Sequence, residues 1–173
     1  QSRSELRKVV RALDDEIVAA FTAAFEEVAS HFAEHFAVLF PGGKGRLRLT
    51  KPNDVLATGV EIEAQPLGKQ LSRLSLLSGG EKSLAALSFL FAVFSARPSP
   101  FYILDEVEAA LDDANLRRFL RLVDRFRASA QLLIVTHQQQ TMGAADILYG
   151  VTMEPGGSSK VLAKRLSDAP VSV

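Results

Sequence analysis

The chain has 173 residues, of which 47% are apolar and 23% charged, enough for one globular domain with a hydrophobic core. Lysine and arginine number 20, as do aspartate and glutamate, so no bulk charge attracts nucleic acid or an anionic membrane. The lack of cysteine excludes disulfides, thiolate metal sites and a cysteine nucleophile. No apolar run has the roughly 18 residues of a membrane-spanning helix, and the N-terminus does not resemble a signal peptide. Because residue 1 is Gln1, not methionine, we expect a piece of a longer protein.

One long helix is predicted from Ser4 to about Phe40. In its first half, apolar residues recur at alternating steps of four and three, the spacing of a coiled-coil seam: Leu6, Val10, Leu13, Ile17 and Ala20. In its second half they form a broad aromatic stripe, typical of a helix that packs on a globular body: Phe21, Phe25, Val28, Phe32 and Phe36. We therefore divide the chain into the end of a coiled coil with its docking helix, residues 1–40, and a globular lobe, residues 41–173.

A small antiparallel sheet is predicted next. Pro41–Gly45 turns the chain, and it is not a phosphate-binding P-loop because the G-x-x-x-x-G-K-[ST] spacing is absent. Arg46–Thr50 and Gly59–Ala64 alternate in polarity, as half-exposed strands do, and Lys51–Asp54 has turn residues. One face of this sheet is expected to be wet.

The stretch Leu77–Ser83, LSGGEKS, predicts a helix start with unusual access to its backbone. Ser78 and Glu81 have the spacing of a capping box. The two glycines between them leave the first turn bare, so that a ligand can approach closely. Unpaired N–H groups and a partial positive charge at a helix start favour a phosphate. The alternative is that Ser78 only caps a buried helix.

The second half of the chain predicts a parallel crossover unit. The helix after Gly80 is apolar almost all round and is expected to be buried on most sides. Two apolar strands, Phe101–Leu104 and Gln131–Thr136, flank a helix from about Ala114 to Arg127 and are expected to be covered on both faces. Two closing strands, Ile147–Met153 and Ser159–Ala163, follow, and the tail from Asp168 is expected to be loose. The predicted fold is α/β, with a mostly parallel sheet flanked by helices and a small antiparallel sheet.

Polar side chains follow both apolar strands. Asp105 and Glu106 end the first strand, and His137 ends the second. Ligands of open α/β sheets bind beyond the carboxyl ends of the strands. One carboxylate suits the Mg²⁺ of a nucleotide and a second can orient or deprotonate a water, while a histidine can donate to a γ-phosphate. The alternatives are a solvated acidic loop and a structural histidine.

These motifs together resemble those of ABC-type ATPases. Leu77–Glu81 resembles the signature LSGGE, Phe101–Glu106 a Walker B strand, Ala109–Asp112 the D-loop, and Thr136-His137 the switch histidine. The wording of three longer stretches is similar to the C-terminal half of the head of structural maintenance of chromosomes (SMC) ATPases: LSGGEKS from Leu77, LDEVEAALDDAN from Leu104 and AADILYGVTM from Ala144. Pro66-Leu67-Gly68, where Pro-Pro-Gly is expected, and Gln138-Gln139, where Asn-Lys is usual, depart from the family pattern.

The resemblance implies ATP and Mg²⁺ as cofactors and a role for each motif residue. Asp105 would help to hold Mg²⁺, Glu106 would polarise the hydrolytic water, and His137 would sense the γ-phosphate. The signature, Ser78 to Glu81, would contact ATP held by an opposite head, through the Ser78 hydroxyl and the N–H groups of Gly79 and Gly80. Asp112 would lie at the interface between the two heads. Hydrolysis would then be phosphoryl transfer by positioning and charge stabilisation.

The resemblance also implies partners. No P-loop lysine motif occurs in the chain, so the N-terminal half of the same head would have to supply it, and the isolated fragment is expected to be inactive. Further expected partners are a second SMC head, the winged-helix domain of a kleisin subunit and, through the full complex, DNA, in chromosome condensation, segregation or cohesion. The location would be cytoplasmic and chromosome-associated, with no membrane partner.

Three other functions fit parts of the sequence. A transporter's nucleotide-binding subunit shares the signature, acid pair and histidine, but it would carry its own P-loop and lack the coiled-coil-like entry helix. The head of a double-strand-break repair ATPase is also split around a coiled coil. A helical adaptor would use Ser78 only as a cap. Whether the natural dimer is homomeric or heteromeric stays open.

Overall fold

A computed structural model describes residues 2–166, and the tail from Asp168 lies outside them. The helices and strands follow in the order α1 (Ser2–Leu39), β1 (Lys44–Leu49), β2 (Val60–Gln65), β3 (Ser72–Arg73), α2 (Gly79–Ala96), β4 (Phe101–Asp105), α3 (Asp113–Arg127), β5 (Gln131–Val135), α4 (Gln139–Gly143), β6 (Ile147–Met153) and β7 (Ser159–Arg165). Two single-turn 3₁₀ helices, Val55–Ala57 and Leu74–Leu76, precede β2 and α2. The mixed α/β class predicted from the sequence is confirmed.

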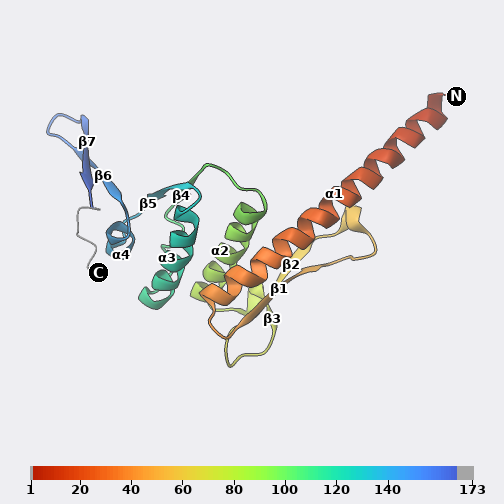
Figure 1. The fold of residues 1–173 in the computed structure, drawn as a ribbon, viewed down its shortest axis with the longest axis horizontal. Coiled ribbons are helices and arrows are strands. Elements are labelled where there is room, and N and C mark those ends of the chain that lie inside the picture. Colours follow the sequence, from red (N-terminus) through yellow and green to blue (C-terminus); the bar gives the residue numbers. More distant parts are fainter. Residues whose placement is uncertain (1, 167–173) are drawn as a thin grey trace.

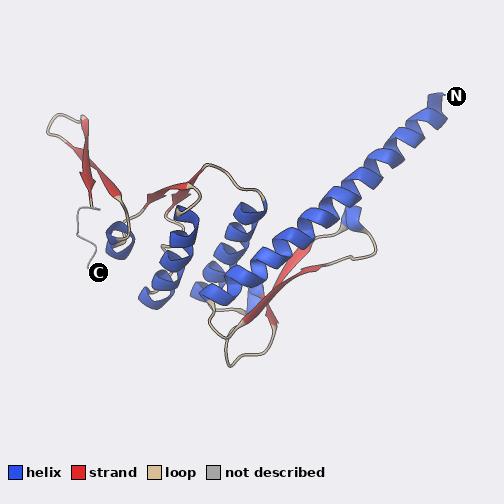
Figure 2. Cartoon of the chain, in the orientation of Figure 1, coloured by secondary structure: helices blue, strands red, loops and turns tan. Residues whose placement is uncertain are grey.

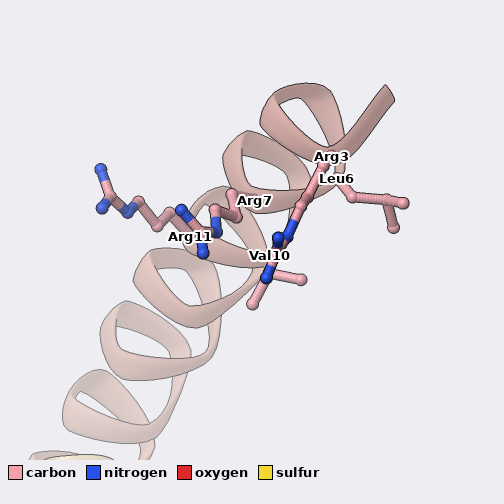
Figure 3. Close-up of a pocket in the computed structure, with 5 residues that line it drawn as sticks. All are labelled: Arg3, Leu6, Arg7, Val10 and Arg11. Atoms are coloured by element: carbon pink, nitrogen blue, oxygen red, sulfur yellow. The ribbon is translucent and has the colours of Figure 1, made fainter. Parts of the chain in front are cut away.

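Helix α1 is one continuous rod of 38 residues, of which only the C-terminal part lies on the body of the molecule (Figure 1). The apolar side chains of its predicted coiled-coil seam are uncovered, since more than half of the surface is exposed in each of Leu6, Val10, Leu13 and Ile17. Figure 3 shows Leu6 and Val10 on one side of the helix and Arg11 on the other, around a shallow hollow that only α1 lines. This hollow has no second wall and is not a ligand cavity.

The core forms where the end of α1 meets α2 and α3. Phe32 and Phe36 of α1, Phe91 of α2 and Phe119 of α3 are fully buried. The rings of Phe91 and Phe126 meet edge to face with centroids 4.8 Å apart, a favourable aromatic arrangement. The aromatic end of the predicted stripe therefore docks on the body, as expected, whereas Phe21, nearer the projecting part, is only half-buried.

The strands form three small sheets within residues 2–166 (Figure 2). β1, β2 and β3 form the predicted antiparallel sheet, with Leu47 opposite Ile62. β4 and β5 pair in parallel, with Asp105 opposite Val135. β6 and β7 form a hairpin in which Val151 faces Val161. The parallel part is thus a single pair of strands, smaller than the mostly parallel sheet that the sequence predicts.

The expectation that β4 and β5 are covered on both faces is wrong for these residues. Tyr102 and Leu104 are buried, but Phe101 and Ile103 are 54% and 65% exposed. In β5, Leu133 and Val135 are 46% and 54% exposed. Within the described residues, only one face of this strand pair is covered. The apolar side chains on the other face have no packing partner among these residues.

A buried histidine joins the three core helices. His35 of α1 is only 8% exposed, its Nε2 lies 2.8 Å from Oγ of Ser95 on α2, and its ring centroid lies 5.6 Å from that of Phe126 on α3. Burial, above all, lowers the pKa of His35 below its ordinary value of 6.5; His31 and Arg125 lower it further and Glu34 opposes them. Protonated His35 is therefore disfavoured in the folded state.

The sign of this pKa shift predicts lower stability in mild acid. Below pH 6.5 His35 binds a proton in the unfolded chain but stays neutral in the folded chain. The free energy of unfolding should therefore fall as the pH is lowered from 7, until the pH passes the lowered pKa of His35. Denaturant titrations between pH 5 and 7.5 measure this slope. His35→Gln should flatten it, and the control His31→Gln should flatten it much less, because burial contributes more to the shift than His31 does. An unchanged slope in His35→Gln would assign it to other groups.

Candidate active site

The start of α2 is held by a network around Glu81. Ser78 is the N-cap residue, and the predicted capping box is present. Oε2 of Glu81 accepts hydrogen bonds from the backbone N–H of Ser78 at 3.1 Å and from its hydroxyl at 2.8 Å. The same carboxylate accepts from Nζ of Lys69 at 2.7 and 3.0 Å. The hydrogen bond from Lys69, with smaller contributions from Ser78, lowers the pKa of Glu81.

The two glycines leave the first turn of α2 open. A Cβ atom placed on Gly79 would meet no atom within 4 Å. One placed on Gly80 would meet Ala110 O and Asn115 Nδ2 at 3.7 Å, which is ordinary contact. Gly79 is exposed and Gly80 half-buried, so a ligand can approach this turn from outside.

The segment before α3 lies against this helix start. Asp112 caps α3, because its Oδ1 accepts from the backbone N–H of Asn115 at 2.8 Å. Asn115 Nδ2, 3.4 Å from Oδ2 of Asp112, also faces Gly80. Buried Leu111 anchors the segment, while Asp112 itself is exposed. The predicted D-loop and signature are therefore neighbours, and Asn115 is the contact that sequence reasoning missed.

The acid pair and the histidine meet at one edge of the parallel pair. Asp105 is the last residue of β4, and the backbone N–H of Glu106 donates to Val135 O at 3.0 Å. Oε1 of Glu106 lies 3.4 Å from Nδ1 of His137. All three side chains are exposed. The parallel register explains why residues 31 positions apart come together.

Glu106 has an uncommon backbone conformation, with φ of 47°. A non-glycine residue in this left-handed region costs about 1–3 kcal/mol and is often found at functional sites. Here the hydrogen bond to β5 holds the peptide in place. This conformation changes the direction of the side chain at the end of β4, and the sequence pattern does not predict it.

The donor set suits a magnesium–nucleotide site. No group of three potential metal-ligating side chains occurs within residues 2–166. Mg²⁺ needs no such group, because it binds one or two carboxylates and completes its shell with water and phosphate oxygens. Asp105, at the exposed end of β4, is a carboxylate of the kind that such a site needs, and Glu106 follows it in the chain.

No helix in the described part of the chain is both long and apolar enough to span a bilayer. The apolar helix α2 has 18 residues but lies in the core.

Comparisons with known proteins agree on one family. The family model described as RecF/RecN/SMC N terminal domain matches residues 11–160. The chain is 55% identical over 165 residues to the chromosome partition protein Smc of Mycolicibacterium paratuberculosis. The matched region covers 95% of this chain but only 14% of that protein. It is 46% identical over 168 residues to the Smc protein of Bacillus subtilis, with 97% and 14% covered.

Solved structures agree with the fold. One, from a study of ATP-driven dimerization and DNA-stimulated activation of SMC ATPases, superposes with a TM-score of 0.80 at 41% identity and covers 86% of this chain and 90% of that one. Another, an Smc head bound to the C-terminal winged-helix domain of ScpA, has a TM-score of 0.78 at 43% identity and covers 85% of this chain and 45% of that one. The chain therefore belongs to the RecF/RecN/SMC family and corresponds to the C-terminal half of an SMC ATPase head.

Proposed function

We propose that this chain binds and hydrolyses ATP with Mg²⁺ once the N-terminal half of the head is present, and that its signature joins two heads around ATP. Hydrolysis would then serve chromosome segregation, condensation or cohesion in a cytoplasmic, DNA-bound complex. The observation that carries the proposal is the meeting of Glu106 and His137, 3.4 Å apart, beside Asp105 at one strand edge. The related study of ATP-driven dimerization supports the use of two heads.

The bare face of β4 and β5 supports the need for a second half. Phe101, Ile103, Leu133 and Val135 are all exposed on it. A contiguous apolar face of this kind usually marks an interaction surface. The hairpin of β6 and β7 is a second uncovered surface. A two-stranded hairpin is only marginally stable in water unless another element packs on it. We assign both surfaces to the N-terminal half.

Each residue at the strand edge then has a task. Asp105 would hold Mg²⁺, directly or through a water, and the bound ion would neutralise charge on the phosphates. Glu106 would accept a proton from, or orient, the attacking water. His137 would donate a hydrogen bond to the γ-phosphate, with its other ring nitrogen facing Glu106. None of these tasks needs a residue that is buried now.

The signature serves the other nucleotide. The N–H groups of Gly79 and Gly80 and the Ser78 hydroxyl would contact the γ-phosphate of ATP on the opposite head, with Glu81 bracing Ser78. Asp112, beside this helix start, would lie at the interface. The open first turn supports this assignment, because a Cβ atom at Gly79 would meet nothing within 4 Å, which leaves room for a phosphate of another head to approach.

Mixing the two halves tests the proposed function. The complete head should dimerise only with ATP and Mg²⁺ and should hydrolyse ATP, whereas the 173-residue chain alone should do neither, because it contains no P-loop lysine motif. Sedimentation and a phosphate-release assay give both readouts. Robust turnover by the isolated chain, or dimers that ignore ATP, would contradict the proposal.

A kleisin winged-helix domain is the proposed protein partner, by analogy with the ScpA-bound head. We assign its docking to the sheet of β1 and β2. Arg46 remains 64% exposed while its Nε pairs with Glu63 at 2.6 Å, and Arg48 pairs with Glu61 and Glu63.

Reversing these two arginines should weaken kleisin capture by the complete head. Arg46→Glu combined with Arg48→Glu places four carboxylates together on an exposed sheet, and a loss of about tenfold or more in affinity is expected from unfavourable interfacial charge. Pull-down with the winged-helix domain measures it, with Lys8→Glu on the projecting part of α1 as the control. Unchanged capture by a variant that still melts cooperatively would move the kleisin site elsewhere.

A further inference from the structure

Lys69 is joined to the signature from outside it. It lies on the loop between β2 and β3, and its side chain is 55% exposed. Its Nζ donates to both oxygens of Glu81, at 2.7 and 3.0 Å. One of those oxygens also accepts from the Ser78 hydroxyl at 2.8 Å. A single carboxylate therefore connects a lysine of the preceding loop to the serine of the signature.

The loop holds Lys69 in place. Its backbone N–H donates to Pro66 O at 3.0 Å, closing a tight turn, and Pro66 is buried. Gly68 occupies the turn with φ of 77°, a conformation that suits glycine. Leu67 projects to solvent at 75% exposure, so the turn is anchored by its backbone and by Pro66. The turn therefore places Lys69 beside Glu81, although twelve residues separate them.

The charge of Glu81 conflicts with the proposed ligand. A helix start attracts a phosphate through its N–H groups and partial positive charge. An unpaired carboxylate one hydrogen bond from the Ser78 hydroxyl would oppose a γ-phosphate arriving there. With the ammonium of Lys69 on the carboxylate, the pair carries no net charge, and Glu81 can keep bracing the Ser78 N–H.

We propose that Lys69 is a positioning residue for the signature: it neutralises Glu81 and holds its carboxylate, so that the Ser78 hydroxyl can turn from Glu81 to a γ-phosphate. When Ser78 turns, Glu81 keeps its hydrogen bonds to Lys69 and to the Ser78 N–H and is not left unpaired. This inference rests on the proposed function of the signature. It adds a residue of the β2–β3 loop to the apparatus that joins the heads.

Charge-matched variants of the complete head test this role. Lys69→Met leaves Glu81 uncompensated and should raise the ATP concentration for half-maximal dimerisation about three- to fivefold, the upper part of the range expected of a half-exposed charge pair. Lys69→Arg should stay within about twofold of the parent, because arginine also pairs with a carboxylate. Lys69→Met combined with Glu81→Gln should recover most of the loss, because glutamine keeps the capping box without the charge. Lys51→Met, on the β1–β2 turn, is the matched control and should change nothing.

The recovery by Glu81→Gln separates charge from structure. If Lys69 only supported the loop, the double variant would dimerise as poorly as Lys69→Met, and that result would overturn the inference, as would parental dimerisation by Lys69→Met. ATP affinity of single heads, measured alongside, should be the same in all variants. Ser78→Arg tests the proposed function separately: if it blocks dimerisation while Lys69→Met does not, only the role of Lys69 fails, and if Ser78→Arg heads still dimerise, the proposed function itself fails.

Discussion

Replacing Glu106 with glutamine is expected to slow ATP hydrolysis by the complete head about 10²- to 10⁴-fold, the usual contribution of a general base. The amide keeps the size of the side chain and its place beside His137, 3.4 Å away in the parent. It cannot accept the proton of an attacking water. The left-handed backbone at Glu106 should be retained, because the hydrogen bond that holds it uses the peptide N–H and Val135 O.

The same variant should accumulate head dimers with ATP, because the contacts that join the heads are untouched while their release is blocked. Phosphate release and sedimentation with ATP report the two effects in one preparation. Glu27→Gln, at an exposed carboxylate of α1 that pairs with Arg97, is the matched control and should behave as the parent. Hydrolysis at the parental rate would remove Glu106 from the role of base.

The features predicted correctly from the sequence are those set by neighbouring residues. The capping box of Ser78 and Glu81 fixed the start of α2 because its hydrogen bonds close within one turn. The apolar run that follows lies within α2, which ends at Ala96. The strand-end positions of Asp105 and His137 followed from two apolar strands joined by a helix, since a parallel pairing brings their carboxyl ends to one edge.

The features that could not be predicted depend on contacts between distant segments. Lys69 reaches Glu81 because a tight turn after Pro66 directs it there, and no spacing rule encodes that path. The φ of Glu106 is set by a hydrogen bond to another strand. The apolar composition of Phe101 to Leu104 predicts a strand that is buried on both faces. It does not predict whether the surface that covers the second face belongs to the same chain, and in the described residues that face is exposed.

The strongest effect on assembly is expected from Ser78→Arg. The long cationic side chain would stand at the positive end of α2, where the proposed γ-phosphate must approach within hydrogen-bonding distance of Gly79 and Gly80. It would also remove the hydroxyl that now donates to Glu81. ATP binding by each head should persist, because the strand-edge residues of the same head are unchanged, whereas ATP-dependent dimers should disappear.

The measurement is cleanest in heads that already carry Glu106→Gln, because dimers then persist and their loss cannot be ascribed to hydrolysis. Loss of the cap should lower the free energy of unfolding by about 1 kcal/mol, too little to unfold a head, and a melting curve verifies this. Ser75→Arg, three residues earlier in an exposed 3₁₀ turn, introduces the same charge and is expected to leave dimers intact. If Ser78→Arg heads dimerise as the Ser75→Arg control does, the bare start of α2 is an ordinary capped helix end, and the surface that joins two heads lies elsewhere on the chain.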